Sequence, residues 1–165
     1  MSTFSVCFLK GAQLKKYLLF VSFLVLSLLL ISCGYTADPD EMLSDFLLLY
    51  GAEGVVYTSD AGEGEEGYIS PELFSSAFRF YNTSPKSFAL FLNSHTDSAS
   101  ECGVFVCRDG AEREAVTEAC LERMSLLSAG ENKMLLVSRN IVFYSTMTEK
   151  DRARDLWSKI LASHT

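Results

Sequence analysis

The sequence predicts an α+β fold: an antiparallel sheet built from two strand-strand-helix units, with one or two extra N-terminal helices. Two observations predict it. Residues 86–163 contain, twice over, a pair of short apolar runs followed by a segment with apolar residues at helical spacing. The preceding residues, 38–81, contain two helix-start motifs with proline at the first helical position. Because strand hairpins are separated by helices, we expect the helices to pack on one face of the sheet.

The first helix is expected to begin after Asp38 and to end at Gly51. Asp38 can accept hydrogen bonds from the first amides of the helix, and Pro39 has a fixed φ that suits the first helical position. Glycine readily takes the left-handed conformation that ends many helices. The apolar side of this helix is expected to consist of Met42, Phe46, Leu49 and Tyr50.

A second, shorter helix is expected to begin at Pro71, after the N-cap residue Ser70. Its apolar residues are Leu73, Phe74, Ala77 and Phe78. Phe80 and Tyr81 should point elsewhere, so the aromatic residues here either line the core or leave an exposed patch for a partner. Residues 59–67, SDAGEGEEG, are predicted to be a solvated loop, because their carboxylates lack the spacing of an EF-hand.

The first strand-strand-helix unit is predicted to have strands at 87–94 and 102–108 and a helix from Asp109 to about Leu127. Both alternate sets of residues in strand 87–94 are apolar, which predicts a strand covered on both faces. Asp109 and Glu112 have the spacing of a capping box. The buried stripe of the helix is expected to contain Val116, Cys120, Met124 and Leu127.

The second unit is predicted to have strands at 133–138 and 141–146, joined by a tight turn at 139–140. Residues 148–151 are expected to cap the last helix. Its apolar face is expected to consist of Ala153, Leu156, Trp157, Ile160 and Leu161. The sheet would then have four strands, and residues 38–165 are expected to form a single domain.

The N-terminal residues have the pattern of a secretory signal. Lys10, Lys15 and Lys16 precede fifteen uncharged, mostly apolar residues, 17–31. A helix needs about 20 residues to cross a bilayer, so this run fits the apolar region of a signal peptide better. An uncleaved anchor helix is the alternative.

The sequence LISC at residues 30–33 resembles the lipobox of bacterial lipoproteins. This resemblance implies a diacylglyceryl group on Cys33, cleavage between Ser32 and Cys33, and a protein anchored at the outer face of the cytoplasmic membrane. Residues 1–32 would be the signal peptide and residues 33–37 a lipid-anchored linker. Two acyl chains hold a protein stably on a membrane, whereas one does so marginally.

Charge limits the partners of the mature chain. Removing residues 1–32 takes away three of the 14 Lys and Arg residues and none of the 21 Asp and Glu residues, which leaves a net charge of about −10. An acidic surface argues against nucleic acid and against electrostatic adhesion to anionic lipid. The membrane is therefore expected to be contacted through the covalent lipid.

Three cysteines remain in the predicted domain: Cys102, Cys107 and Cys120. An odd number excludes a complete disulfide framework. Cys102 and Cys107 lie five positions apart on one predicted strand and so point to opposite faces. Buried thiols are expected, and a bridge from Cys120 to one of the other two is the alternative. No metal site and no cofactor are predicted, because the spacing matches no zinc motif.

No catalytic motif is present: the chain has no G-x-S-x-G, no phosphate loop and no H-E-x-x-H. The alternative function is a weak thiol- or metal-dependent enzyme that uses His95, Asp97 and Cys102. A Cys–His pair needs hydrogen-bond distance and an orienting group. We expect His95 to be a solvated turn residue, and His164, the penultimate residue, to be frayed.

The arrangement of residues 38–163 is similar to that of small lipoproteins of Gram-positive anaerobes, a family known only as a domain of unknown function. The likeness lies in a leading helix, PDEMLSDFLLLYG, in the segment RDGAEREAVTEACLERM and in the hairpin KMLLVSRNIVFYST. This chain departs from the family in its larger number of Cys and Phe residues. The resemblance implies no activity. We therefore expect a binding or interaction module whose ligand and protein partner the sequence does not identify.

Overall fold

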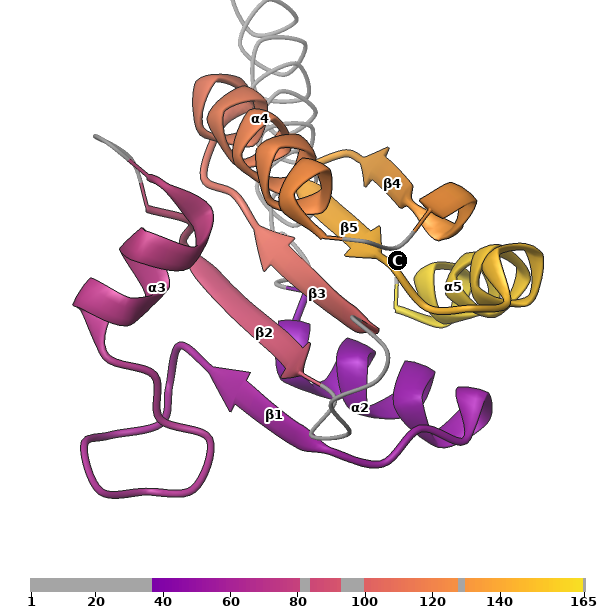
Figure 1. Cartoon of the computed structure of the whole chain (residues 1–165), viewed down its shortest axis with the longest axis horizontal. Helices are drawn as coiled ribbons and strands as arrows, with labels where there is room; N and C mark the ends of the chain where they lie inside the picture. The colour runs from indigo at the N-terminus through magenta and orange to yellow at the C-terminus, as the bar shows by residue number, and fades with distance from the viewer. Residues whose placement is uncertain (1–36, 81–83, 93–99, 128–129, 165) are drawn as a thin grey trace, which may run out of the picture. The chain divides into compact units, whose positions relative to one another are not determined.

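The computed structural model describes residues 37–80, 84–92, 100–127 and 130–164, and residues 37–165 form one compact unit. Five strands make one antiparallel sheet in the order β1-β2-β3-β5-β4 (Figure 1). The strands are β1 (Val55–Thr58), β2 (Ser87–Leu92), β3 (Glu101–Val106), β4 (Met134–Ser138) and β5 (Ile141–Ser145). The helices are α2 (Pro39–Tyr50), α3 (Pro71–Phe78), α4 (Gly110–Leu126) and α5 (Lys150–Ser163), with a short 3-10 helix, η1 (Gly130–Asn132). The predicted α+β class with N-terminal helices is confirmed.

The sheet has one strand more than the four expected. β1 pairs with β2 from Val55↔Leu92 to Thr58↔Ala89 and forms one edge of the sheet. At four residues, β1 is too short for its apolar alternation to identify a strand from sequence. The expected hairpin is confirmed, with Arg139 and Asn140 between β4 and β5 and Arg139 in the left-handed region at φ 52°.

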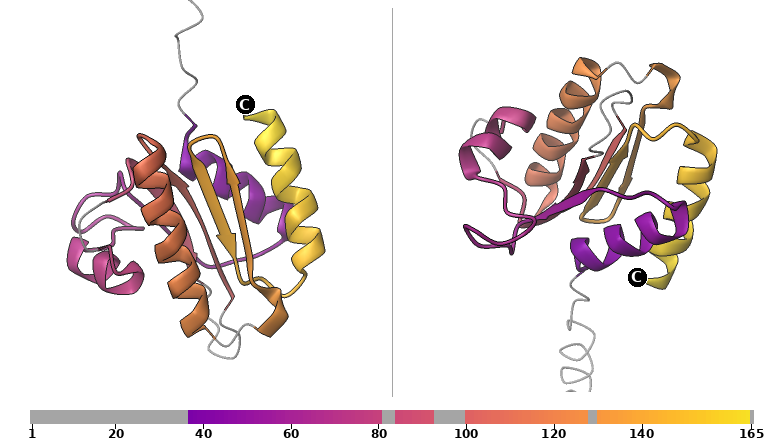
Figure 2. Two further views of the ribbon diagram at one scale, coloured as in Figure 1. Left: turned by 90° about the horizontal axis from the view of Figure 1, so that it is seen from above. Right: turned by 60° about the horizontal axis from the view of Figure 1, so that its bottom comes forward.

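Helices cover both faces of the sheet, so the expectation that they pack on one face is wrong. Helices α2 and α5 lie on one face, and α3 and α4 lie on the other (Figure 2). In β2, Ala89 and Phe91 point into the core beneath α2 and α5, whereas Phe88 and Leu90 point into the core beneath α3 and α4. The prediction that this strand is covered on both sides is confirmed.

The cap of α2 is confirmed, but its buried side differs from the expected one. The Asp38 side chain accepts a hydrogen bond from the Asp40 amide at 3.0 Å, and Gly51 ends the helix at φ 77°. Leu49, expected on the buried side, is 51% exposed. The residues of α2 that are buried are Pro39, Met42, Leu43, Phe46 and Leu47.

The aromatic residues that the structure describes around α3 line the core, and Tyr81 lies outside the described residues. Phe74 stacks on Phe88 with 4.1 Å between ring centroids, and both rings are buried. Phe80 was expected to point elsewhere, but its ring lies 5.3 Å from that of Phe74. The helix ends at Arg79, whose left-handed conformation (φ 48°) breaks the helical spacing and turns the chain back.

The C-terminal helix is docked along its whole length. Ala153, Trp157 and Ile160 are buried as predicted, and the Trp157 ring stacks on Phe143 at 4.0 Å. Glu149 is the N-cap residue of α5 and makes no capping hydrogen bond with its side chain, so the predicted cap is wrong in this detail. His164 is buried rather than frayed, and its Nε2 lies 3.1 Å from Asp45 Oδ2 of α2.

Candidate functional site

The structure separates the residues of the predicted sites. Ser32, Cys33, His95 and Asp97 lie outside the described residues. Cys102 lies on β3 and is fully buried in the core beneath α2 and α5. Burial, followed by the neighbouring carboxylate of Glu101, raises the pKa of the Cys102 thiol far above its ordinary value. Since the thiolate is the nucleophile, Cys102 is poorly suited to nucleophilic catalysis.

The other two cysteines lie in the opposite core. Cys107 and Cys120 both pack beneath α3 and α4, which confirms that Cys102 and Cys107 point to opposite faces. All three thiols are free and buried. Burial raises the pKa of Cys107 to about 11, with a smaller contribution from Glu112. A buried thiol of this kind packs as a small apolar side chain.

A buried polar cluster that the sequence did not reveal is centred on Glu101, the first residue of β3. Its carboxylate accepts hydrogen bonds from Arg123 Nε at 2.9 Å and Arg123 Nη2 at 2.8 Å, both from α4. It also accepts one from the Tyr144 hydroxyl of β5 at 3.0 Å. Burial, together with the charge of Glu101, raises the pKa of the Tyr144 hydroxyl well above its ordinary value. Sequence patterns could not detect this cluster, because its members are 22 and 43 positions from Glu101.

The hydrogen-bonding groups of this cluster pair with one another. No buried side-chain nitrogen or oxygen within the described ranges is left without a hydrogen-bond partner. A saturated ion pair of this kind orients β3, β5 and α4 relative to one another. Its geometry therefore points to a structural role rather than to a ligand site.

A second buried carboxylate, Glu112, holds the start of α4. It accepts hydrogen bonds from the Arg108 amide at 2.6 Å and from Arg108 Nε at 3.0 Å, while its own amide donates to Asp109 Oδ1 at 2.9 Å. The Asp-x-x-Glu spacing predicted this cap. The carboxylate reaches the amide of Arg108, one residue before the Asp109 N-cap.

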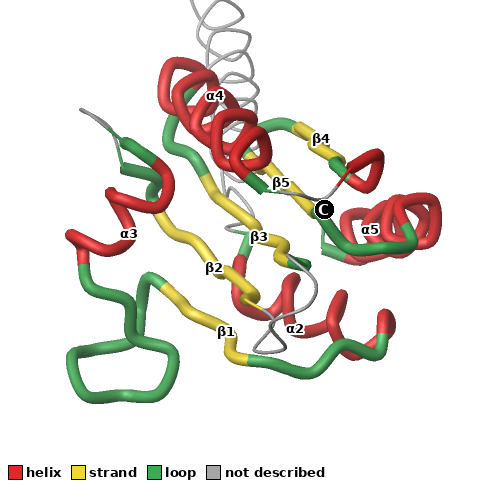
Figure 3. Tube along the Cα trace, viewed as in Figure 1, coloured by secondary structure: helices red, strands yellow, loops and turns green. Residues whose placement is uncertain are grey.

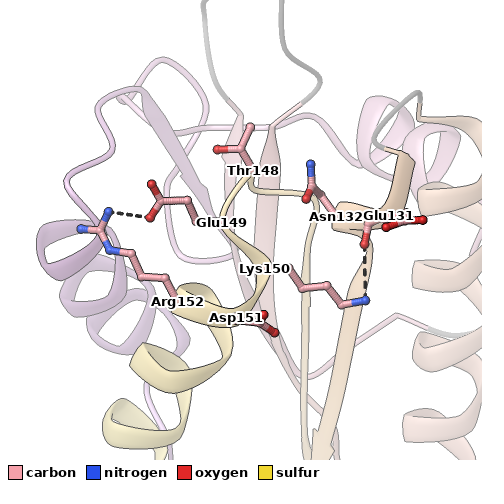
Figure 4. Close-up of a pocket in the computed structure, with 7 residues that line it drawn as sticks. All are labelled: Glu131, Asn132, Thr148, Glu149, Lys150, Asp151 and Arg152. Carbon is pink, nitrogen blue, oxygen red and sulfur yellow. Dashed lines mark hydrogen bonds and ion pairs between the residues drawn. The ribbon is translucent and has the colours of Figure 1, made fainter.

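One polar hollow of about 370 Å³ opens beside the start of α5 (Figure 4). Residues of η1 line one side, and Thr148 and the first turn of α5 line the other. Lys150 Nζ donates to the Glu131 carbonyl at 3.4 Å, and Arg152 pairs with Glu149 at 2.9 Å. Both of these cations thus already bond to oxygens of the protein.

No group of three or more His, Cys, Asp or Glu residues in the described ranges could hold a metal ion. Within the same ranges, none of the helices has the length and apolar character needed to span a bilayer. Comparisons with protein family models, with curated proteins and with solved structures find no match to this chain.

Proposed function

We propose that this chain is a lipid-anchored protein that acts as an interaction module at the outer face of the bacterial cytoplasmic membrane. The observation that carries the proposal is where the LISC motif lies relative to the fold. Cys33 precedes Ala37, the first residue of the compact unit, by only four positions. Cleavage before Cys33 would thus leave every residue of that unit in the mature chain.

The short spacer supports a domain held against the membrane. Four extended residues reach about 14 Å, so α2 would start close to the lipid headgroups. The acidic mature chain, with a net charge of about −10, would be repelled by anionic lipid, and a covalent anchor overcomes this repulsion. Buried thiols with raised pKa values and internally paired carboxylates favour interaction over catalysis.

Replacement of Cys33 by Ser tests the anchor. Wild-type protein should fractionate with membranes and yield an N-terminal peptide that starts at Cys33 and carries a diacylglyceryl mass. Cys33→Ser should remain as unprocessed precursor without the lipid, because serine lacks the thiol that accepts it. Cys7→Ser is the matched control and should behave as wild type. An unmodified Cys33, or a mature chain that starts before it, would contradict the proposal.

A further inference from the structure

The two edges of the sheet differ in how the rest of the fold bonds to their outward backbone groups, and this difference points to a binding site. At the β1 edge, the Thr58 amide donates to the Gly67 carbonyl at 3.0 Å. The Val56 carbonyl lies so close to Gly67 that a Cβ built there would be 2.6 Å from its oxygen. Gly67 belongs to the loop between β1 and α3, drawn green in Figure 3, and thus occupies the Thr58 end of this edge. An added strand could not pair with the Thr58 amide, because that amide already donates to Gly67.

At the other edge, β4 presents free backbone groups. The Cys107 amide donates to the Asn140 carbonyl, and the Thr146 amide donates to the Glu101 carbonyl. In the segment 140–146, which contains β5, the even-numbered residues therefore bond toward β3. The odd-numbered residues of β5 therefore bond toward β4. They pair in the register Ile141↔Ser138, Phe143↔Leu136 and Ser145↔Met134.

This register leaves the amides and carbonyls of Leu135 and Val137 pointing outward from the sheet. Within the described ranges, these groups have no hydrogen-bond partner. The left view of Figure 2 looks onto this edge, with α4 on one side and α5 on the other. Two residues with free amides and carbonyls can accept an added strand.

Apolar side chains adjoin the free edge on the α4 side. Val137 is 47% exposed, and Leu121 of α4 is 51% exposed. Arg113, two turns before Leu121 on the same side of α4, donates from Nη1 to the Arg139 carbonyl at 2.7 Å, which fixes that side of the helix toward the β4–β5 hairpin. An added strand could thus cover apolar surface as well as form backbone hydrogen bonds.

Charge selects the partner. No carboxylate lies in β4 or in its turn, and Lys133 and Arg139 bracket the strand in an otherwise acidic domain. A second copy is disfavoured, because pairing Leu135 with Val137 of the copy would place Lys133 opposite the copy's Arg139. An acidic strand would instead find complementary charge at both ends.

We propose that the β4 edge binds an extended, acidic segment of a partner protein, which adds to the sheet as a sixth strand. Its backbone would pair with Leu135 and Val137, its apolar side chains would cover Val137 and Leu121, and its carboxylates would lie near Lys133 and Arg139. This inference rests on the proposed role as an interaction module and names the class of partner.

The test measures binding of a fluorescein-labelled peptide that alternates glutamate and valine to the full chain in detergent micelles, by fluorescence anisotropy. We expect saturable binding that weakens at least about tenfold when alternate peptide amides are N-methylated or when lysine replaces glutamate. Val137→Pro should weaken binding equally, because it removes an outward amide that the β4–β5 ladder does not use. Val137→Thr keeps that amide and should bind within about twofold of wild type.

Each arm has an outcome that would overturn the inference. Equal binding of the N-methylated peptide would exclude strand addition, and equal binding of the lysine peptide would exclude charge selection. A dimer that Val137→Pro abolishes, without peptide binding, would assign the edge to a second copy. If Val137→Pro fails to fold, the peptide arms still decide. None of these readouts depends on the lipid on Cys33, so this inference and the anchor can fail separately.

Discussion

Glu101 is a buried charged residue that joins β3, α4 and β5. Its side chain is buried, and the partner that neutralises it, Arg123, is 25% exposed. Removing one member of a buried pair leaves the other charge without compensation, which usually costs more than the pair contributes. A surface pair such as Arg79–Glu122, with both side chains half-exposed, lacks that penalty.

We therefore expect Arg123→Met to lower the free energy of unfolding by about 3 kcal/mol, at the low end for buried pairs because solvent reaches the guanidinium. Tyr144→Phe removes one hydrogen bond and should cost about 1–1.5 kcal/mol. Arg79→Met is the control and should cost less than about 1 kcal/mol. Urea unfolding measures all three. Equal losses for Arg123→Met and Arg79→Met would mean that Glu101 does not need its partner.

Single residues were also where sequence reasoning failed most often. His164 was expected to be frayed because it is penultimate, but α5 carries it against α2, next to Asp45. Leu49 was expected inside, but the side of α2 that faces the sheet includes Leu43 and Leu47 instead. The positions of both side chains depend on how helices dock in the fold, and local periodicity carries no information about docking.

At the level of elements, local signals were sufficient where the chemistry is local. Asp38, Ser70 and Asp109 each accept a hydrogen bond from a helix amide with the side chain, as their spacing predicted. Glu149 does not, because its carboxylate pairs with Arg152. Short aspartate and serine side chains can reach back to the first amides, whereas the longer glutamate is found at N-caps less often.

The caps of α2 and α5 should therefore respond differently to substitution. Asp38→Ala removes the acceptor for the first amides of α2 and should lower the free energy of unfolding by about 1 kcal/mol. Glu149→Ala removes only an exposed ion pair and should change the free energy of unfolding by less than about 0.5 kcal/mol. Thermal unfolding followed by circular dichroism compares the two variants. A larger loss for Glu149→Ala would mean that the Arg152 bridge, rather than the cap, stabilises the α2–α5 contact.

At the scale of the whole molecule, the number of elements was largely predictable and their layering was not. The two strand-strand-helix units look alike in sequence order, but α4 and α5 pack on opposite faces of the sheet. β3 and β5 are antiparallel neighbours, so a two-fold axis perpendicular to the sheet would place both helices on the same face. The units are therefore similar in order but not related by that symmetry. The helix α2, outside the repeated pattern, shares its face with α5.

The two separate cores also explain why the domain should not need a disulfide. Cys102 lies in one core, while Cys107 and Cys120 lie in the other, and none is bonded. Each core has its own large buried side chains, Trp157 and Phe143 in one and Phe105 and Tyr144 in the other. Thiols contribute to both cores only as small packed groups.

A fragment of residues 37–165 with all three cysteines replaced by Ala should therefore unfold cooperatively and lose only a few kcal/mol from packing.

The pH dependence of the stability of this fragment should also change on replacement of the cysteines. Burial raises the pKa of Cys107 from 9.0 to about 11, so the folded state keeps this proton while the unfolded chain loses it. The contribution of Cys107 is thus complete below pH 9.0 and is lost as the pH rises toward 11. Urea unfolding at pH 7 and pH 10 should show a steeper alkaline loss of stability in wild type than in the variant. Unfolding of the wild-type fragment by reductant alone would instead indicate a bridge.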